Sequence, residues 1–361
     1  MNDKKNDFDV KIMMTSDAYT PVAPKISILI PVYNVAAYVQ DCLNSVLMQI
    51  DHEAEIIVYD DASTDSSQEI LVKLQRDKPQ VKVIYATENR GVSFARNMLK
   101  QQARGQYLWF IDSDDIVAEH AYTVIREAID DHPDVDVIIG DYYFWDESKT
   151  PSLSLEKTFS GRTRRVMQNR DNQFLKVLNH LKKNYIWCQV YRRDLLTDID
   201  FQLRERFEDI FFITDVSQHC QSYIYLAKPL IHYRYRPYSS TTSRKNIRYV
   251  DDYLSAFLHR SHQVLASSLM TCKANAYLHY KLYMQYASFI KEIMHDAHLS
   301  AEEKGVLVLY IAQHFQDEYA HIAQQLCGPL DVIRQFRLNR KQKQVQHYYQ
   351  VWGVVEPAAL K

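Results

Sequence analysis

Glycine is scarce in this chain, and the glycine-rich loops that bind phosphates in many nucleotide-binding proteins are missing. Only 7 of the 361 residues are glycine, and neither a Gly-x-Gly-x-x-Gly motif nor a Walker-type lysine loop follows the first hydrophobic run. Both motifs hold phosphates on the backbone N–H groups of a glycine-rich turn. The usual dinucleotide-binding and P-loop interpretations are therefore excluded.

Paired cysteines and long hydrophobic runs are missing as well. The 5 cysteines are scattered, without a Cys-x-x-Cys pair, which argues against a zinc site and is typical of a reducing compartment. The first twenty residues contain no apolar signal-peptide core, and no run approaches the roughly eighteen apolar residues of a membrane span. We therefore expect a cytoplasmic protein.

The charges of the chain are nearly balanced. A formal net charge of −2 gives no sign of a nucleic-acid-binding protein. Hydrophobic residues at 47% and charged residues at 24% describe an ordinary globular chain, which is long enough for two or three structural units. Tyrosine is abundant, at 26 residues, and this composition fits aromatic-lined surfaces.

The stretch Tyr107–Ile116 carries the most informative motif of the sequence. Its apolar, aromatic-rich run predicts a buried strand that ends in carboxylates. Asp112 and Asp114 flank Ser113, so an extended backbone would put both acids on one side, at the carboxyl end of a central strand. Two hard oxygen ligands there suit Mg²⁺ or Mn²⁺ carrying a diphosphate. The alternative is a polar strand end followed by a helix cap.

Strands and helices alternate through the first half of the chain. Hydrophobic runs predict strands within 25–34, 55–65, 81–85 and 107–116, and helical spacing of apolar residues fills most of the segments between them. This alternation predicts an α/β fold, a Rossmann-like, doubly wound and mostly parallel sheet. Residues 250–361 are helical in pattern, so we expect a helical C-terminal region.

Four motifs in the first half resemble those of family 2 glycosyltransferases, which have the GT-A fold. They stand in that family's order at Ile28–Asn34, Val58–Asp65, Glu88–Asn97 and Phe110–Asp115. The resemblance implies an inverting, metal-dependent enzyme that uses Mn²⁺ or Mg²⁺. Its donor would be a nucleotide sugar, UDP-linked, and its acceptor a glycan or lipid-linked glycan in bacterial cell-surface polysaccharide or lipopolysaccharide synthesis.

The resemblance also divides the chain into regions. Residues 1–24 would be a polar tail, and 25–145 would be the nucleotide-sugar-binding half of the GT-A domain. Residues 146–249 would be the acceptor-binding half with the catalytic base, and 250–361 the helical C-terminal region.

The resemblance carries residue roles on the donor side. Pro31 and Tyr33 would border the base, and Asp61 would accept a hydrogen bond from the uracil ring N–H. Asp112 would hold the ribose, and Asp114 would be the metal ligand that bridges the diphosphate. The remaining donor-side positions are Asn89, Arg96, Ser113 and Arg236.

An acidic pair in Phe207–Phe212 marks a second chemical centre. Alone, Glu208 and Asp209 are explained as the start of a helix, where acids are favourably placed. The resemblance implies instead that Asp209 is the general base, which takes the proton of the acceptor hydroxyl. Glu208 and Trp187 would lie on the acceptor side, where Gln189 stands at a position that is commonly lysine in the family.

Several basic residues have alternative interpretations. Arg234 and Arg236 offer donors for a leaving diphosphate, in a segment that resembles one that closes over the donor. For Arg96 the alternative is a helix-surface ion pair, and for His232 a structural role competes with a metal or phosphate contact. A C-terminal basic face is either a solvated helix face or a contact with an anionic membrane. Its residues are Arg334, Arg337, Arg340, Lys341 and Lys343.

Two rival functions stay open. A sugar nucleotidyltransferase also uses acids and Mg²⁺, but it normally needs a glycine-rich, lysine-containing first loop, which Pro31–Asn34 lacks. A catalytically inactive glycan-binding or scaffold protein of the same fold would be favoured if Asp209 lay far from Asp114. A helical row of tyrosines is either a packing stripe or a sugar platform. Its members are Tyr277, Tyr280, Tyr283 and Tyr286.

Overall fold

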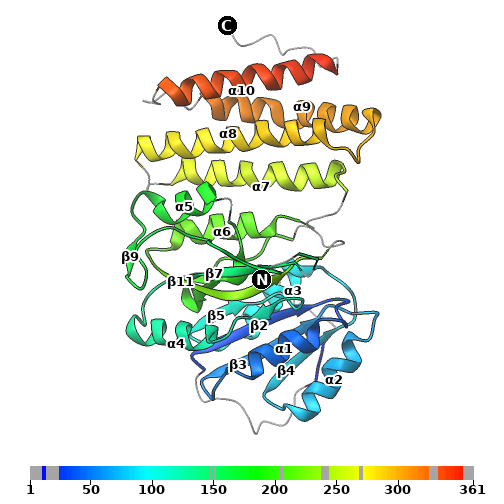
Figure 1. Cartoon of the computed structure of the whole chain (residues 1–361), viewed down its shortest axis with the longest axis vertical. Helices are drawn as coiled ribbons and strands as arrows, with labels where there is room; N and C mark the ends of the chain where they lie inside the picture. The colour runs from blue at the N-terminus through cyan, green and yellow to red at the C-terminus, as the bar shows by residue number, and fades with distance from the viewer. Residues whose placement is uncertain are drawn as a thin grey trace, which may run out of the picture. The chain divides into compact units, whose positions relative to one another are not determined.

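The structure is a computed structural model, which describes residues 10–13, 24–146, 148–149, 152–181, 183–203, 206–236, 244–267, 271–324 and 332–352. The chain forms two compact units (Figure 1). Unit 1 comprises residues 1–169 and 181–236, and unit 2 comprises residues 170–180 and 237–361.

Unit 1 is built on a single sheet flanked by helices. Its strands are β1 (Val10–Met13), β2 (Ile26–Val32), β3 (Ala54–Asp60), β4 (Val81–Ala86), β5 (Tyr107–Phe110), β6 (Ile116–Val117), β7 (Val137–Trp145), β8 (Leu153–Glu156), β9 (Met167–Gln168), β10 (Gln189–Arg192) and β11 (Ser222–Arg234). Its helices are α1 (Val39–Leu47), α2 (Ser67–Asp77), α3 (Val92–Gln102), α4 (Ala121–Asp131) and α6 (Glu208–His219), with the short 3₁₀ helices η2 (Ile186–Cys188) and η3 (Arg193–Leu196).

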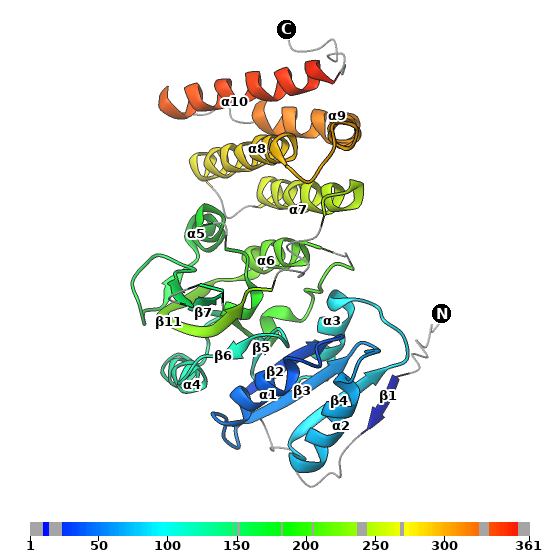
Figure 2. The ribbon, with the colours of Figure 1, turned by 45° about the vertical axis from the view of Figure 1, so that its right-hand side comes forward.

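The sheet runs in the order β1-β4-β3-β2-β5-β10-β7-β11-β6. Strands β4, β3, β2 and β5 form a parallel block (Figure 2), and β11 is parallel to β7. Strand β10 lies between β5 and β7 and is antiparallel to both. The alternation of strands and helices therefore predicted the α/β fold correctly.

Helices cover both faces of the parallel block, because its strands are apolar on both faces. Strands β2 and β3 are buried along their whole length. Ile28 is in register with Ile56 and Trp109, and all three belong to a core that α1, α2 and α4 share. On the opposite face, α3 lies against β2 and β3, and Phe110 contacts Phe212 of α6 with ring centroids 6.2 Å apart. The sheet is therefore doubly wound.

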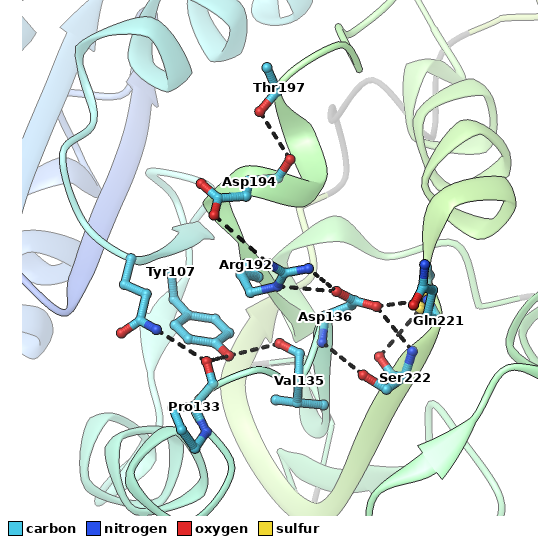
Figure 3. A network of polar contacts seen from close by, with 11 residues as sticks. Tyr107, Pro133, Val135, Asp136, Arg192, Asp194, Thr197, Gln221 and Ser222 are labelled. Atoms are coloured by element: carbon cyan, nitrogen blue, oxygen red, sulfur yellow. Dashed lines mark hydrogen bonds and ion pairs between the residues drawn. The ribbon is translucent and has the colours of Figure 1, made fainter.

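A buried acid organises the sheet at the amino end of β7 (Figure 3). One oxygen of Asp136 accepts a hydrogen bond from Arg192 at 2.6 Å, and the other accepts from the backbone N–H groups of Gln221 at 2.7 Å and Ser222 at 3.0 Å. At the start of β5, the hydroxyl of Tyr107 donates to two backbone carbonyls. Structural contacts therefore occupy this edge of the sheet.

The region boundaries differ from those expected. Residues 10–13, within the expected polar tail, form β1 and pair with β4. A short edge strand needs hydrogen-bond partners on one side only, so it can form in a mostly polar stretch. Residues 25–145 and 181–236, expected as parts of two halves of one domain, lie in one unit, in which β10 inserts between β5 and β7. Unit 2 also begins earlier than residue 250 and includes 170–180.

Unit 2 is helical, as predicted for residues 250–361. Its elements are η1 (Arg170–Asn172), α5 (Gln173–Leu181, of which Leu181 belongs to unit 1), α7 (Ile247–Ala266), α8 (Cys272–His295), α9 (Ala301–Gln324) and α10 (Val332–Val351). Tyr280, Tyr283 and Tyr286 of α8 are buried, and Tyr286 stacks on Tyr319 of α9 with ring centroids 4.1 Å apart. The tyrosine row is therefore mainly a packing stripe.

The basic face of α10 is only partly within the described side chains. Arg337, Arg340 and Lys343 are exposed, Lys341 is half-buried, and the side chain of Arg334 lies outside what the structure describes. Among the helices that the structure describes, none combines the length and the apolar composition that crossing a bilayer requires.

Candidate active site

The strand-end acids lie in a turn directly after β5. The backbone N–H of Asp115 donates to the carbonyl of Asp112 at 3.1 Å and closes the turn. Asp112 is partly exposed, whereas Ser113 and Asp115 are buried. Because β5 lies between β2 and β10, the acids stand at the carboxyl edge of the parallel block. Open α/β sheets bind their ligands at this edge.

The end of β11 holds Asp114 and Asp115. Asp114 forms an ion pair with Arg236, and the carboxylate of Asp115 accepts a hydrogen bond from the backbone N–H of Arg234 at 2.9 Å. Burial raises the pKa of Asp114, and the charge of Asp112 raises it further, although Arg236 opposes both effects. The turn is therefore an acidic cluster that favours a cation.

Two arginines converge on this turn through aromatic contacts that the sequence analysis missed. The guanidinium carbon of Arg234 lies 4.2 Å from the ring centroid of Trp145 and 5.1 Å from that of Tyr38. Arg236 lies 5.0 Å from the centroid of Tyr38. The Nε of Arg234 also donates to the carbonyl of Asp114 at 3.2 Å. Tyr38 precedes α1 and Trp145 ends β7, so no local motif marks them as partners.

A second acid lies where β3 ends. Asp61 accepts hydrogen bonds from the backbone N–H groups of Arg90 at 3.0 Å and Gly91 at 2.7 Å, just before α3. Burial raises the pKa of Asp61, although these two bonds oppose the shift. Asn89 is exposed and donates to the carbonyl of Asp61 at 3.2 Å. The neighbouring Asp60 is buried and accepts a hydrogen bond from an α2 side chain.

The end of β2 lies beside these residues. Pro31 is buried and in register with Tyr59, whereas the ring of Tyr33 is 46% exposed. Asn34 has a left-handed φ of 51°, and its side chain accepts a hydrogen bond from the backbone N–H of Thr64 at 2.7 Å. The turn that presents Tyr33 is therefore fixed, and its aromatic ring is open to a ligand.

Arg96 joins the strand-end acids to the second chemical centre. Its Nη2 bonds to Oδ1 of Asp112 at 2.8 Å, and its Nη1 bonds to Oε1 of Glu208 at 2.6 Å. Burial lowers the pKa of Arg96, but the two carboxylates raise it above its usual value overall. The ion-pair alternative for Arg96 is therefore present, in buried form rather than on a helix surface.

Glu208 and Asp209 are the first residues of α6. Phe207 has a left-handed φ of 60°, so the chain turns sharply into the helix. Both acids are half-buried, and Oδ1 of Asp209 accepts a hydrogen bond from the backbone N–H of Ile210 at 2.8 Å. Both carboxylates therefore lie at the amino terminus of a helix, where the helix dipole is positive.

Trp187 is enclosed by tyrosines. Its ring stacks on Tyr185, with centroids 4.8 Å apart, and on Tyr233, with centroids 5.3 Å apart, while Tyr142 meets it edge-on at 5.0 Å. Only 6% of Trp187 is exposed. The Trp187 ring is therefore packed between aromatic neighbours and is not open to a ligand. The ring of Tyr235 is 41% exposed and offers an open aromatic surface that the sequence analysis missed.

Two other positions make structural contacts. Gln189 is buried, and its Nε2 donates to the carbonyl of Tyr185 at 3.2 Å. His232 lies against Tyr143 with ring centroids 5.0 Å apart, and burial lowers the pKa of this histidine. A neutral, packed imidazole fits the structural alternative for His232.

The acids of the turn fit a divalent cation bound together with a diphosphate. Within the described residues, no three His, Cys, Asp or Glu side chains come together as a complete metal cage. Mg²⁺ sites that serve nucleotides use one or two carboxylates and take further ligands from phosphates and water. Asp112 and Asp114 supply that number of hard oxygen donors.

Comparisons with known proteins show which family the first half of the chain matches. Residues 27–200 match the family described as Glycosyl transferase family 2. The chain is 32% identical to EpsH of Bacillus subtilis (strain 168), a glycosyltransferase by name, over 58% of this chain and 61% of EpsH. It is 25% identical to GgaB of the same organism, named a minor teichoic acid biosynthesis protein, over 90% of this chain and 34% of GgaB. Both matches span less than two thirds of the relative.

A solved structure has the same fold. The crystal structure of residues 1–349 of S. aureus TarS in complex with UDP-GlcNAc superposes with a TM-score of 0.68 and 20% identity, over 91% of this chain and 90% of that 1–349 chain. The GT-A fold that the motifs predicted is therefore confirmed. The matched domain, residues 27–200, belongs to glycosyltransferase family 2.

Proposed function

We propose that this protein is an inverting, metal-dependent glycosyltransferase that moves a sugar from a nucleotide-sugar donor, UDP-linked, to a glycan acceptor. The observation that carries the proposal is the contact of one guanidinium, that of Arg96, with Asp112 at 2.8 Å and Glu208 at 2.6 Å. Asp112 belongs to the donor motif, and Glu208 precedes the candidate base. Transfer in a single displacement needs these two centres side by side.

The donor would bind along the carboxyl edge of the parallel block. Tyr33 and Asp61 would contact the base, with Pro31 beneath it, and Asp112 would hold the ribose. The fixed turn around Tyr33 supports these roles, since a preformed site loses little entropy on binding. The UDP-GlcNAc complex of TarS, a protein with the same fold, supports a UDP-linked donor.

The diphosphate would lie between the acids and the arginines. Asp114, beside Asp112, would hold Mn²⁺ or Mg²⁺, which when bound neutralises charge on the leaving diphosphate. Arg234 and Arg236 would donate hydrogen bonds to the same phosphate oxygens. The stacking of Arg234 on Trp145 supports this role, because it orients the guanidinium in advance.

Asp209 would be the general base. It would take the proton of the acceptor hydroxyl while that oxygen attacks the anomeric carbon and the bond to the diphosphate breaks. Attack from the face opposite the leaving group inverts the configuration. Glu208, fixed by Arg96, would hold the first turn of α6 in place. Tyr235 and the aromatic cluster around Trp187 would line the acceptor side.

The acceptor would be a growing bacterial cell-surface polysaccharide, which the name of GgaB supports. If it is lipid-linked, the enzyme works beside an anionic membrane, and α10 suits that surface. Its 20 residues include five lysines and arginines and no acid. Each such charge contributes about 1 kcal/mol near an anionic bilayer.

Vesicle sedimentation tests the membrane contact. We expect binding to phosphatidylglycerol-containing vesicles at low salt, little binding to pure phosphatidylcholine vesicles, and loss of binding when Arg337, Arg340 and Lys343 are replaced by glutamine. Equal binding to both vesicle types, or none to either, would remove the membrane role and leave the transferase proposal intact.

A panel of nucleotide sugars with Mn²⁺ tests the function itself. A true donor at 100 times its Kd should stabilise the protein by about 2.7 kcal/mol. The same mixture should slowly release UDP, because water can replace the acceptor. Stabilisation without UDP release, even with added glycans, would favour the inactive scaffold. Release of pyrophosphate from UTP and a sugar phosphate would identify a nucleotidyltransferase instead.

A further inference from the structure

Arg96 is placed as a link rather than as a phosphate ligand. Only 5% of the residue is exposed, and its two terminal nitrogens point to carboxylates on separate elements, Asp112 after β5 and Glu208 on α6. The guanidinium also lies 5.5 Å from the ring centroid of Phe201. Both nitrogens that bind phosphate most readily are therefore already used.

The link adds a polar connection between two segments, the turn after β5 and the start of α6, which also pack through Phe110 and Phe212. Asp112 and Glu208 are 16 and 112 residues from Arg96 in sequence. The side chains of Arg96 and Glu208 are both largely buried, at 6% and 14% exposure, so releasing the contact with Glu208 would leave a mostly buried carboxylate without this cation. A change in the hydrogen bonding of one carboxylate should therefore alter the position of the other.

We propose that Arg96 is a positioning residue that transmits donor binding from Asp112 to the first turn of α6, where Glu208 and the candidate base Asp209 lie. A ribose on Asp112 would draw on the same carboxylate that holds Arg96, and so would fix the guanidinium and with it Glu208. The base would then be ordered only when the donor is in place. This inference rests on the proposed function.

Amide hydrogen exchange with and without UDP and Mn²⁺ tests the link. In the wild type, UDP with Mn²⁺ should slow exchange in residues 111–115 and also in residues 207–212, by roughly tenfold at the helix start. In Glu208→Gln and Arg96→Met, UDP should still protect residues 111–115, but the protection of residues 207–212 should disappear. Arg96→Lys should restore it at most in part, because a single ammonium cannot reproduce the spacing of the two guanidinium nitrogens that contact Asp112 and Glu208.

A matched control is available at the other edge of the sheet. Arg192 also holds a buried acid, Asp136, so Arg192→Met should destabilise the protein while the response of α6 to UDP persists. Undiminished protection of residues 207–212 in both Glu208→Gln and Arg96→Met would overturn the proposal. So would a loss of that protection in Arg192→Met, which would reduce the effect to general instability.

A ligand-free measurement separates this inference from the proposed donor. If UDP protects no part of the wild type from exchange, the donor assignment fails. The link through Arg96 is then tested by amide exchange in the ligand-free Asp112→Asn variant. This substitution weakens the hydrogen bond between residue 112 and Arg96. Amide exchange in residues 207–212 should therefore rise by roughly fivefold. Unchanged exchange there would overturn the link, whatever the donor is.

Discussion

The carboxylate of Asp114 is ion-paired with the guanidinium of Arg236, which lies two residues beyond the end of β11. A partly buried acid thus has a protein cation at the position where a metal-bound diphosphate is expected. Arg236 offsets the repulsion between Asp112 and Asp114 in this state. A divalent cation and Arg236 would therefore compete for the same carboxylate until a diphosphate accepts both.

Asp114→Ala should abolish the metal-dependent part of UDP binding and leave the fold intact. Asp112 and Asp114 are the two carboxylates offered to the cation. Removing the one on Asp114 should therefore lower the affinity for UDP in the presence of Mn²⁺ by about 100-fold. Isothermal titration of UDP with and without Mn²⁺ measures this loss. Asp194→Ala, at an exposed acid on η3, serves as the control. Wild-type affinity with unchanged Mn²⁺ dependence would refute the metal assignment.

Arg236→Ala should act in opposite directions on the metal and on the nucleotide. Without its competitor, Asp114 should bind Mn²⁺ alone about tenfold more tightly, whereas UDP should bind about tenfold more weakly because a phosphate donor is lost. Manganese titration followed by electron paramagnetic resonance separates the two effects. Arg164→Ala removes an exposed arginine and should change neither. Weaker binding of Mn²⁺ alone would contradict the competition.

Asp141 should make stability depend on pH. Burial raises the pKa of this β7 acid, although hydrogen bonds from Thr158 and Tyr225 oppose the shift. A folded-state pKa above the unfolded value adds stability that is complete below the unfolded pKa and is lost as pH rises through the folded pKa. Each unit of elevation corresponds to about 1.4 kcal/mol.

Asp141→Asn removes that titration. Its free energy of unfolding should therefore increase relative to the wild type as pH rises from about 3.5 to about 7, where the wild type must carry a buried charge. Urea unfolding across this range measures the difference, and the exposed Asp194→Asn should run parallel to the wild type. A constant offset at every pH would show that Asp141 does not titrate differently on folding.

The parallel block and its motifs could be predicted from sequence because their signals are local. Strand β2 is an apolar run that stops at Tyr33, and β5 is one that stops at Asp112, so periodicity alone gives both strands and the edge where they end. The antiparallel insertion of β10 could not be predicted, since pairing across long separations leaves no periodic mark. For the same reason β1 is hidden within a polar stretch.

The contacts of the site were harder to predict than its residues. Arg96 and Glu208 are individually visible in their motifs, but only the fold brings them to 2.6 Å across 112 residues. Tyr38 and Trp145 carry no motif, and their role depends on where Arg234 lies. Trp187 stands out in the sequence, yet its neighbours cover both ring faces, which no linear pattern reveals.

Asp209→Asn tests the central claim most directly. A base contributes to the transition state and little to donor affinity, so the rate of UDP release from the donor, with acceptor or with water, should fall by about 10²–10⁴-fold. The Kd for UDP with Mn²⁺ should stay within about threefold of the wild type, because a general base acts on the acceptor hydroxyl rather than on the donor. Glu208→Gln should lower the rate less severely, because it acts through position.

The competing explanation of Asp209 is an acid that only stabilises the start of α6. It predicts a loss of about 1 kcal/mol in stability and near-normal turnover. The rate of UDP release, the UDP Kd and the Tm are therefore measured on one purified Asp209→Asn protein. We predict a rate lowered by at least about 100-fold at unchanged Kd. A rate within a few-fold of the wild type would contradict the assignment of Asp209 as the base.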